Sequence, residues 1–282
     1  MSEAVVITGS GLVSALGDSP AVFHGALCEG RTAFVAPTMP GAESFTGHRV
    51  AQIAEFAPKT YLGAKNFRPL DRTGQFAASA AALALADSGW TPERRAEYEI
   101  GLTLGTMFGG LHTIGEFDRR CLRDGPGYVS PIDFSNTVIN AAAGQVAIWH
   151  QARGINTTVA CGAASGVQAL GYAAGLVRTG RAAALMAGGA EELCFETFYG
   201  FLRAGFLRPE EADTDGLPRP FDARRQGWTL GEGAGLLVLE AETSARARGA
   251  RIIGRVEGFG AAYDSREALD GDTEPNALVA AI

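Results

Sequence analysis

The sequence contains few cysteines and few histidines, and they are not arranged as metal ligands. Its four cysteines are spread over 282 residues, and none forms a Cys-x-x-Cys pair or lies at a zinc-ligand spacing from a histidine. This argues against a zinc site and against a disulfide framework, and it favours a reducing compartment. The cysteines are Cys28, Cys121, Cys161 and Cys194, and the histidines are His24, His48, His112 and His150.

An excess of basic charge and long apolar runs are also missing. The formal net charge is −7, so a nucleic-acid-binding role is not expected, because phosphate contacts need a basic surface. The apolar run Ala182–Ala190 is too short to span a bilayer. Residues Met1–Ile7 lack the basic segment that opens a signal peptide. We therefore expect a soluble, cytoplasmic protein.

Glycine is the residue in excess, at 38 of 282 residues. The glycines lie at the ends of apolar runs and follow no collagen-like repeat. Hydrophobic residues make up 46% and charged residues 20%, a composition typical of globular proteins. The length allows one large domain or two modest ones.

Short β-rich runs alternate with alanine-rich helical segments. This alternation predicts an α/β fold with largely parallel central strands. Strands that are apolar throughout indicate a sheet covered on both faces. The expected strands are Ala4–Thr8, Glu99–Leu104, Ile155–Ala160, Ala182–Ala187, Gly233–Glu240 and Ile252–Phe259. The expected helices are Ser19–Glu29, Asp71–Ser88, Phe134–His150 and Gly162–Thr179.

Two glycine-rich segments could suggest a phosphate-binding loop. Gly9-Ser10-Gly11 follows a predicted strand, but position 14 is a serine where a dinucleotide-binding motif has its third glycine. We interpret it as a tight strand-to-loop turn. Gly231–Gly235 leads into a strand, so it lacks the helix N-terminus behind a phosphate cradle, and close backbone packing explains it better. Glu232 inside it is either a buried structural carboxylate or a surface residue.

Cys161 is the strongest candidate for chemistry. It lies between a predicted strand and a predicted helix, where a thiol would face unpaired N–H groups and the positive end of the helix dipole. Both favour the thiolate, which is the nucleophilic form. The small residues of Gly162–Gly166 allow a sharp turn and a narrow channel to the sulfur. From its position alone, Cys161 is either an inert core residue or a nucleophile.

Several segments together resemble the β-ketoacyl synthases of the thiolase superfamily. They occur in the family's order and span the whole chain, which is similar to the N-terminal two-thirds of the family. The likeness is closest to the elongating synthases of type II systems, which work with discrete acyl carrier proteins. The matching segments are Val5–Gly9, Asp71-Arg72, Asn140 with Gly144, Thr158–Cys161, Ala187–Glu191, Arg219–Asp222 and Gly231–Glu240.

The resemblance implies a layered αβαβα thiolase-like fold and a reaction. Residues 1–250 would form the N-terminal ketosynthase half, and 251–282 the truncated start of the C-terminal half. An acyl group would move from carrier protein to Cys161, whose own N–H would form half of an oxyanion hole. A malonyl-carrier would then decarboxylate and attack, giving a β-ketoacyl product in fatty acid or polyketide synthesis. The resemblance implies no metal or organic cofactor.

The resemblance also implies partners and further site residues. The partners would be acyl- and malonyl-loaded carrier protein, and a second synthase subunit in a homodimer or heterodimer. A bulky Phe108 would shorten the acyl pocket, although it could equally be a core aromatic. The basic residues could equally be ordinary surface charges. The implied acyl-pocket residues are Met107, Phe108 and Phe201, and the implied carrier-docking residues are Lys65, Arg68 and Arg203.

The chain departs from the family pattern at its end. The family's two catalytic histidines, its active-site lysine and its gating phenylalanine would follow Ile282, and no histidine here matches them. We therefore expect acyl loading on Cys161 but no condensation by these residues alone. One alternative is a non-catalytic partner of the chain-length-factor type, which the presence of Cys161 disfavours. Another is a nucleotide-dependent oxidoreductase, which rests only on Gly9-Ser10-Gly11.

Overall fold

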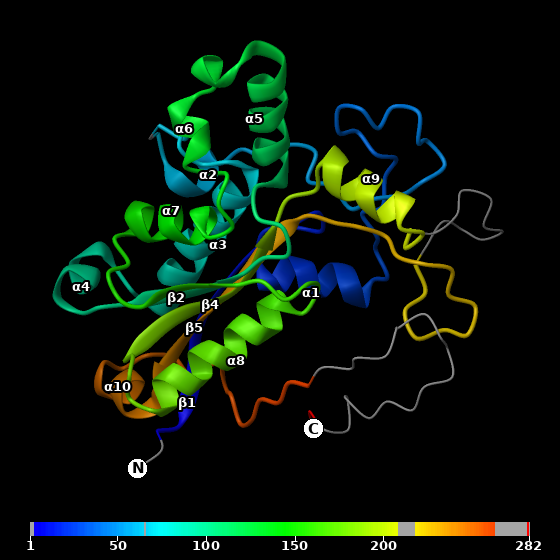
Figure 1. The fold of residues 1–282 in the computed structure, drawn as a ribbon. Coiled ribbons are helices and arrows are strands. Elements are labelled where there is room, and N and C mark those ends of the chain that lie inside the picture. Colours follow the sequence, from blue (N-terminus) through cyan, green and yellow to red (C-terminus); the bar gives the residue numbers. More distant parts are fainter. Residues whose placement is uncertain (1–2, 65, 208–217, 263–280, 282) are drawn as a thin grey trace.

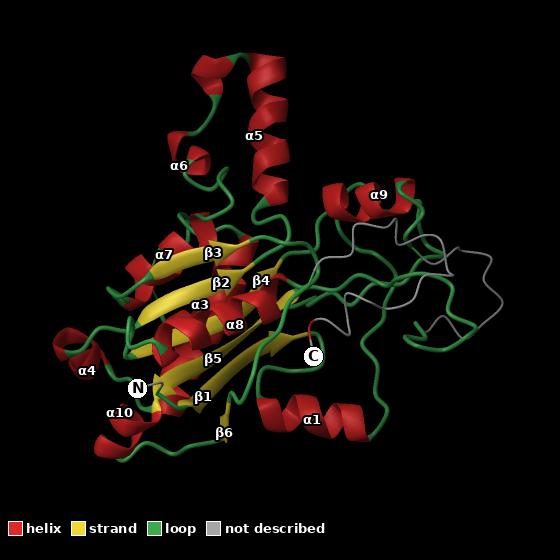
Figure 2. Cartoon of the chain, turned by 60° about the horizontal axis from the view of Figure 1, so that its bottom comes forward, coloured by secondary structure: helices red, strands yellow, loops and turns green. Residues whose placement is uncertain are grey.

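The strands form one mixed sheet with helices on both faces (Figures 1 and 2). The computed structural model describes residues 3–64, 66–207, 218–262 and 281. The strand order is β3-β2-β4-β5-β1-β6. The strands are β1 (Val5–Ser14), β2 (Gly101–Gly105), β3 (Asn156–Val159), β4 (Ala184–Glu191), β5 (Gly233–Ala241) and β6 (Gly254–Arg255). The helices are α1 (Pro20–Cys28), α2 (Lys59–Leu62), α3 (Arg72–Ser88), α4 (Pro92–Glu97), α5 (Leu111–Asp124), η1 (Pro126–Tyr128), α6 (Pro131–Phe134), α7 (Ala141–His150), α8 (Ser165–Arg178), α9 (Phe195–Arg203) and α10 (Glu242–Ala247).

The α/β class is confirmed, but the prediction of largely parallel pairing was wrong. β2 pairs in parallel with β3 and β4, whereas β4–β5, β5–β1 and β1–β6 are antiparallel. Apolar strands indicate that both faces are covered, and antiparallel strands between two helical layers satisfy that condition equally well. The hydrophobic pattern therefore carries no information on direction here.

Alternate residues of each central strand enter separate cores on the two faces of the sheet. In β4, Met186 packs in the core formed with α3 and α7, while Leu185 and Ala187 pack in the core formed with α8. α3 and α8 therefore cover opposite faces of the sheet (Figure 1). This is the period-two alternation of a strand buried on both sides.

The two helices with complete start and stop signals are confirmed. α1 begins after Ser19, whose Oγ accepts the Val22 N–H. α3 begins after Asp71, whose Oδ1 accepts the Gly74 N–H at 2.7 Å. α3 ends at Gly89, which takes the left-handed conformation at φ 72°. Such caps act within one turn, which is why they can be read from the sequence.

Gly9-Ser10-Gly11 is not the predicted tight turn, because β1 continues through it to Ser14. The two glycines let α3 lie directly against the strand. A Cβ atom on Gly11 would lie 2.0 Å from the Ala80 carbonyl oxygen, and one on Gly9 would lie 2.6 Å from Ser88. No helix follows this segment at once, so it also lacks the layout of a dinucleotide-binding loop.

The predicted helix over Phe134–His150 was wrong in its first part, because α6 ends at Phe134 and α7 begins only at Ala141. Between them, the Ser135 and Thr137 hydroxyls donate to backbone carbonyls, and the Asn136 side chain donates to the Pro69 carbonyl. Such side-chain bonds compete with helical backbone bonds. The predicted strand Ile252–Phe259 is also shorter than expected, as only β6 pairs with β1.

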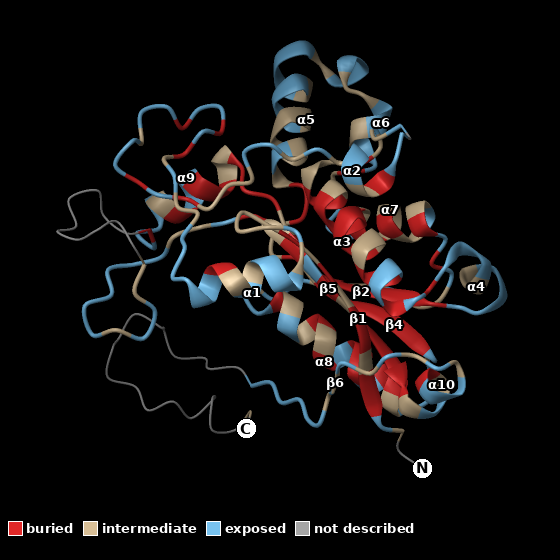
Figure 3. Cartoon of the chain, turned by 180° about the vertical axis from the view of Figure 1, so that it is seen from behind, coloured by how far each residue is buried: buried red, intermediate tan, exposed pale blue. Residues whose placement is uncertain are grey.

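The burial pattern separates the sheet from its outlying helices. In Figure 3 the central strands and α3 are largely buried, whereas α5 and α6 are exposed or half-buried. These two helices extend away from the sheet and contain no buried residue.

No helix in the described part of the chain is long and apolar enough to cross a membrane. The predicted boundary at residue 250 stays a prediction, since residues 263–280 and 282 lie outside the description.

Candidate active site

Cys161 lies in a short turn between β3 and α8. β3 ends at Val159, and the Cys161 side chain is exposed. Gly162 follows at φ 74°, a left-handed conformation that glycine adopts without strain. α8 begins at Ser165, so the predicted helix start at Gly162 was wrong by three residues. Cys161 therefore precedes the helix by a full turn of chain and does not cap its first N–H groups directly.

The buried Ser165 hydroxyl organises this turn. It accepts the Cys161 N–H at 2.9 Å and donates to the Gly162 carbonyl at 2.6 Å. The N–H that was predicted to form half of an oxyanion hole is thus already used inside the turn. For it to stabilise an oxyanion, the Ser165 hydroxyl would have to release it.

A cavity of about 560 Å³ opens beside this turn, at the carboxyl ends of β2 and β4. Crevices at the carboxyl ends of parallel strands are a common place for ligand sites. Its walls include three residues of the turn, Gly162, Ala163 and Ser165. The three predicted acyl-pocket residues, Met107, Phe108 and Phe201, line the same cavity. The structure therefore brings the predicted pocket and the cysteine turn together, while the binding of an acyl chain there stays a prediction.

An aromatic cluster forms the apolar wall of this cavity. The Phe108 and Phe201 rings meet edge-on, with centroids 6.2 Å apart and planes at 84°. Phe201 also contacts Trp228, at a centroid distance of 5.7 Å. Tilted and edge-on pairs of this kind stabilise aromatic clusters beyond their buried area. Phe108 is thus held in a fixed orientation at the cavity wall.

Glu191, at the end of β4, holds the loop that carries Met107 and Phe108. Its carboxylate accepts the Thr106 hydroxyl at 2.9 Å and the backbone N–H groups of Met107 and Phe108 at 2.5 and 3.1 Å. Burial raises the pKa of Glu191, while these three donors favour its ionised form. The carboxylate positions one wall of the cavity.

The next residue, Glu192, was not singled out from the sequence. It is buried, lines the same cavity and accepts the His112 N–H at 3.0 Å. Burial raises its pKa to about 8, and the nearby carboxylates of Asp71 and Glu191 add to this, while Arg72 opposes it. Two adjacent carboxylates, Glu191 and Glu192, where an apolar strand ends are the signal that could have found it.

Glu232, which the sequence left open, is a buried structural carboxylate. It forms an ion pair with Arg72, with 2.6 Å between Nη2 and Oε1, and it accepts the Ile53 N–H at 2.8 Å. Its second oxygen accepts the Arg72 Nε and the Leu193 N–H. Glu232 thus ties the start of α3 to the segment after β4, beside the cavity.

The predicted docking residues and the histidines lie elsewhere. Arg68 and Arg203 are exposed, and neither forms an ion pair with a residue that the structure describes. Lys65 lies outside the described residues. None of the four histidines is among the described residues that line the cavity beside Cys161. The docking role of Lys65, Arg68 and Arg203 therefore stays a prediction. No histidine in the described part of the chain is placed to act at the cysteine turn.

Comparison with known proteins identifies the family. The family model for the β-ketoacyl synthase N-terminal domain matches residues 2–245. The chain belongs to the β-ketoacyl synthase family. It is 35% identical over 271 residues to 3-oxoacyl-(acyl-carrier-protein) synthase 2 of Rhizobium meliloti (strain 1021), covering 93% of this chain and 64% of that protein. It is 32% identical over 262 residues to the protein of the same name from Vibrio harveyi, covering 93% of this chain and 63% of the other.

Solved structures of ketosynthases share the fold. A β-ketoacyl synthase from Burkholderia phymatum STM815 superposes with a TM-score of 0.84 at 32% identity, covering 94% of this chain and 65% of that one. A structure described as the ishigamide ketosynthase/chain length factor gives a TM-score of 0.85 at 31% identity, covering 95% and 65%. The thiolase-like fold is thus confirmed. The chain spans just under two-thirds of the length of the curated relatives cited here.

Proposed function

We propose that this chain accepts an acyl group on Cys161 from an acyl carrier protein, as the loading part of a β-ketoacyl synthase. The observation that carries the proposal is the placement of an exposed thiol in a turn that walls a partly aromatic cavity. An acyl chain attached to Cys161 has an apolar wall beside it in Phe108 and Phe201. Membership of the family supports the same reading.

The loading step is an acyl transfer between two sulfur atoms. The Cys161 thiolate attacks the carbonyl carbon of the carrier thioester, and the tetrahedral intermediate expels the carrier thiolate. The acyl group is then held as a thioester on Cys161. In the condensation step of a β-ketoacyl synthase, loss of CO₂ from a malonyl-carrier supplies the carbanion that attacks this thioester and releases the cysteine thiolate. The described residues place no histidine to assist that second step.

A carrier protein and a second subunit are parts of the same proposal. Arg68 and Arg203 offer exposed positive charge for an acidic carrier protein. β3 is the edge of the sheet and pairs only with β2 among the described strands, so its outer side offers free backbone groups to a second subunit. On this basis, and because the family resemblance implies a second subunit, we propose a homodimer or a heterodimer in the cytoplasm.

A non-catalytic partner subunit is the second candidate. It is favoured by the TM-score of 0.85 with a structure described as a ketosynthase/chain length factor. Such a subunit would bind a synthase without carrying an acyl group. The two candidates differ in one observable property, which is covalent loading of Cys161.

We expect Cys161 to be the preferred acylation site when the chain is incubated with octanoyl-carrier protein. The four thiols differ in access: Cys161 and Cys28 are exposed, Cys121 is half-buried and Cys194 is buried. Burial also raises the pKa of Cys194 to about 11, which disfavours its thiolate. Of the two exposed thiols, only Cys161 has a cavity beside its turn that can hold the acyl chain. Peptide mapping by mass spectrometry should therefore find the octanoyl group on Cys161 roughly tenfold more often than on Cys28.

Cys28→Ala and Cys161→Ala are matched controls, since each removes one exposed thiol. Loading should survive the first substitution and disappear with the second, while both variants melt like the parent. Equal labelling of all four cysteines would show only nonspecific thiol exchange and would contradict the proposal. Absence of loading together with co-purification of a full-length synthase would support the partner-subunit candidate.

Phe108→Ala should shift loading toward longer acyl chains. The Phe108 ring occupies the cavity wall, and its removal opens space for additional methylene groups. Each buried methylene contributes about 0.8 kcal/mol, so two more should favour the longer chain by roughly tenfold. Competition between octanoyl- and dodecanoyl-carrier protein measures this ratio. Phe206→Ala is the control, because Phe206 packs on Phe201 without lining the cavity, and an equal shift there would contradict the assignment.

A further inference from the structure

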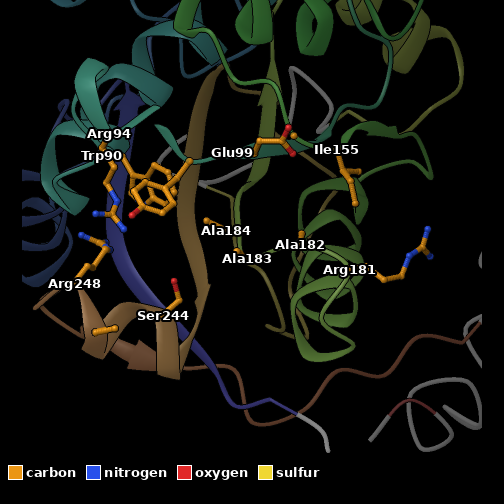
Figure 4. Close-up of a pocket in the computed structure, with 13 residues that line it drawn as sticks. Trp90, Arg94, Glu99, Ile155, Arg181, Ala182, Ala183, Ala184, Ser244 and Arg248 are labelled. Atoms are coloured by element: carbon orange, nitrogen blue, oxygen red, sulfur yellow. The ribbon is translucent and has the colours of Figure 1, made fainter. Parts of the chain in front are cut away.

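A separate cavity of about 460 Å³ lies at the end of the sheet opposite Cys161 (Figure 4). Its walls are formed where the parallel strands begin, by Glu99 before β2, Ile155 before β3 and Ala183 before β4. Helices α4 and α10 close its other side with Arg94 and Ser244. None of the residues that line it takes part in the cysteine turn or its cavity.

Arg94 brings an uncompensated positive charge to this cavity. Its guanidinium stacks on the rings of Trp90 and Tyr98, with 4.9 Å from Cζ to each centroid. It forms no ion pair with a carboxylate among the described residues, and its Nε is buried without a hydrogen-bond partner there. The planar guanidinium group fits the paired oxygens of a carboxylate or phosphate.

Arg248 is the second guanidinium beside the cavity, but its charge is already balanced. It pairs with the fully buried Glu240 through two contacts, Nη2–Oε1 at 2.5 Å and Nε–Oε2 at 2.9 Å. Its Cζ lies 5.9 Å from the Trp90 ring centroid, so the Trp90 ring contacts both guanidinium groups. Figure 4 shows the Arg94 and Arg248 side chains extending toward one another, while Arg181 extends away from them.

The opposite wall differs in charge. Glu99 contributes an exposed carboxylate there, away from the pair of guanidinium groups in Figure 4. The Tyr98 side chain, which also lines the cavity and contacts Arg94, is exposed. The cavity thus offers a positive end, an aromatic side chain and a hydrogen-bond-accepting end. Its volume lies within the range of small-molecule sites.

We propose that this cavity binds a small phosphate monoester with an aromatic group, of the nucleoside monophosphate class. The phosphate lies against Arg94 and the Ser244 hydroxyl, the aromatic group stacks on Tyr98, and an amino or hydroxyl group of the ligand donates to Glu99. The site is independent of acyl loading on Cys161. Ligand binding at this end of the sheet can therefore be measured separately from acyl loading at the other end.

Calorimetric titration of the chain with adenosine 5′-monophosphate tests the proposal at low ionic strength. We expect saturable binding with a Kd of about 1 mM or tighter. Adenosine and inorganic phosphate each lack one of the two recognised groups and should bind roughly tenfold more weakly. Absence of saturable binding of the monophosphate below about 10 mM would overturn the proposal. Inorganic phosphate binding as tightly as the monophosphate would overturn the aromatic part of it.

Variants locate the site. Arg94→Gln should weaken binding of the monophosphate by roughly tenfold, since it removes the charged donor. Arg153→Gln is the matched control: it removes the same charge from an exposed neighbouring residue that does not line the cavity, and it should change Kd by less than about twofold. Ser244→Ala, a mild change on α10, should weaken binding of the monophosphate about threefold. This variant tests the site even if Arg94→Gln does not fold. Equal effects of Arg94→Gln and Arg153→Gln would show long-range charge only and would contradict the site.

Discussion

Gly11→Ala is expected to destabilise the protein by about 4 kcal/mol or more, or to prevent folding. The added methyl group would lie 2.0 Å from the Ala80 carbonyl oxygen and 2.5 Å from the Ala84 nitrogen. Both are backbone atoms inside α3, so no rotamer change can relieve the overlap, and the whole helix would have to move away from β1. α3 packs along the sheet in the larger core, so such a movement would open voids along its length.

Gly25→Ala is the matched control for this prediction. Gly25 lies inside α1, and a Cβ there meets no atom within 4 Å beyond its chain neighbours and the backbone of its own helix. Alanine has the higher helix propensity, so this variant should gain up to about 1 kcal/mol. Urea unfolding of the parent and the two variants gives the comparison. A loss below about 1 kcal/mol for Gly11→Ala would show that α3 can retreat from the strand at little cost, against the packing described above.

The elements that were predicted best are those whose signals lie within a few residues. α1 and α3 each carry a capping side chain at the start and a glycine at or just after the end, and both were located to within one or two residues. Direction and length of pairing were predicted poorly. β6 and the antiparallel return of β5 depend on partners far away in the sequence. Hydrophobic periodicity reports which faces are buried and not which strand lies alongside.

The candidate site shows the same division. Cys161 was singled out by its position between a predicted strand and a predicted helix, and Phe108 and Phe201 were named through the family resemblance. The structure places the cysteine turn and the two rings around one cavity. Ser165, which holds the Cys161 N–H, could not be found, since its role depends on a turn that was taken for the first turn of α8. Glu192 was missed because its environment comes from the start of α3 and the start of α5, which approach it only in the folded chain.

The buried carboxyl of Glu192 should make stability depend on pH. Its pKa in the folded protein is raised to about 8 by burial, with Asp71 and Glu191 adding to the shift and Arg72 opposing it. Between the ordinary value of 4.5 and about 8, the folded protein therefore holds a proton that the unfolded chain has released. The stabilisation is complete below the unfolded pKa and is lost as the pH rises through the folded one. The free energy of unfolding should fall over this interval.

Glu192→Gln removes this titration and keeps an oxygen that can accept the His112 N–H. The slope of unfolding free energy against pH, measured by urea titration from pH 5 to 8, should become less negative by up to about 1.4 kcal/mol per pH unit. Part of the slope should persist, because burial also raises the pKa of Asp71 and Glu191.

Glu93→Gln is the control for this prediction. The pKa of Glu93 is lowered, by hydrogen bonds from its own backbone and from Thr91, so it stays ionised throughout the interval and its replacement should leave the slope unchanged. A Glu192→Gln slope equal to that of the parent would mean that this carboxyl is ionised in the folded protein at pH 5, and that Arg72 outweighs burial at this end of β4.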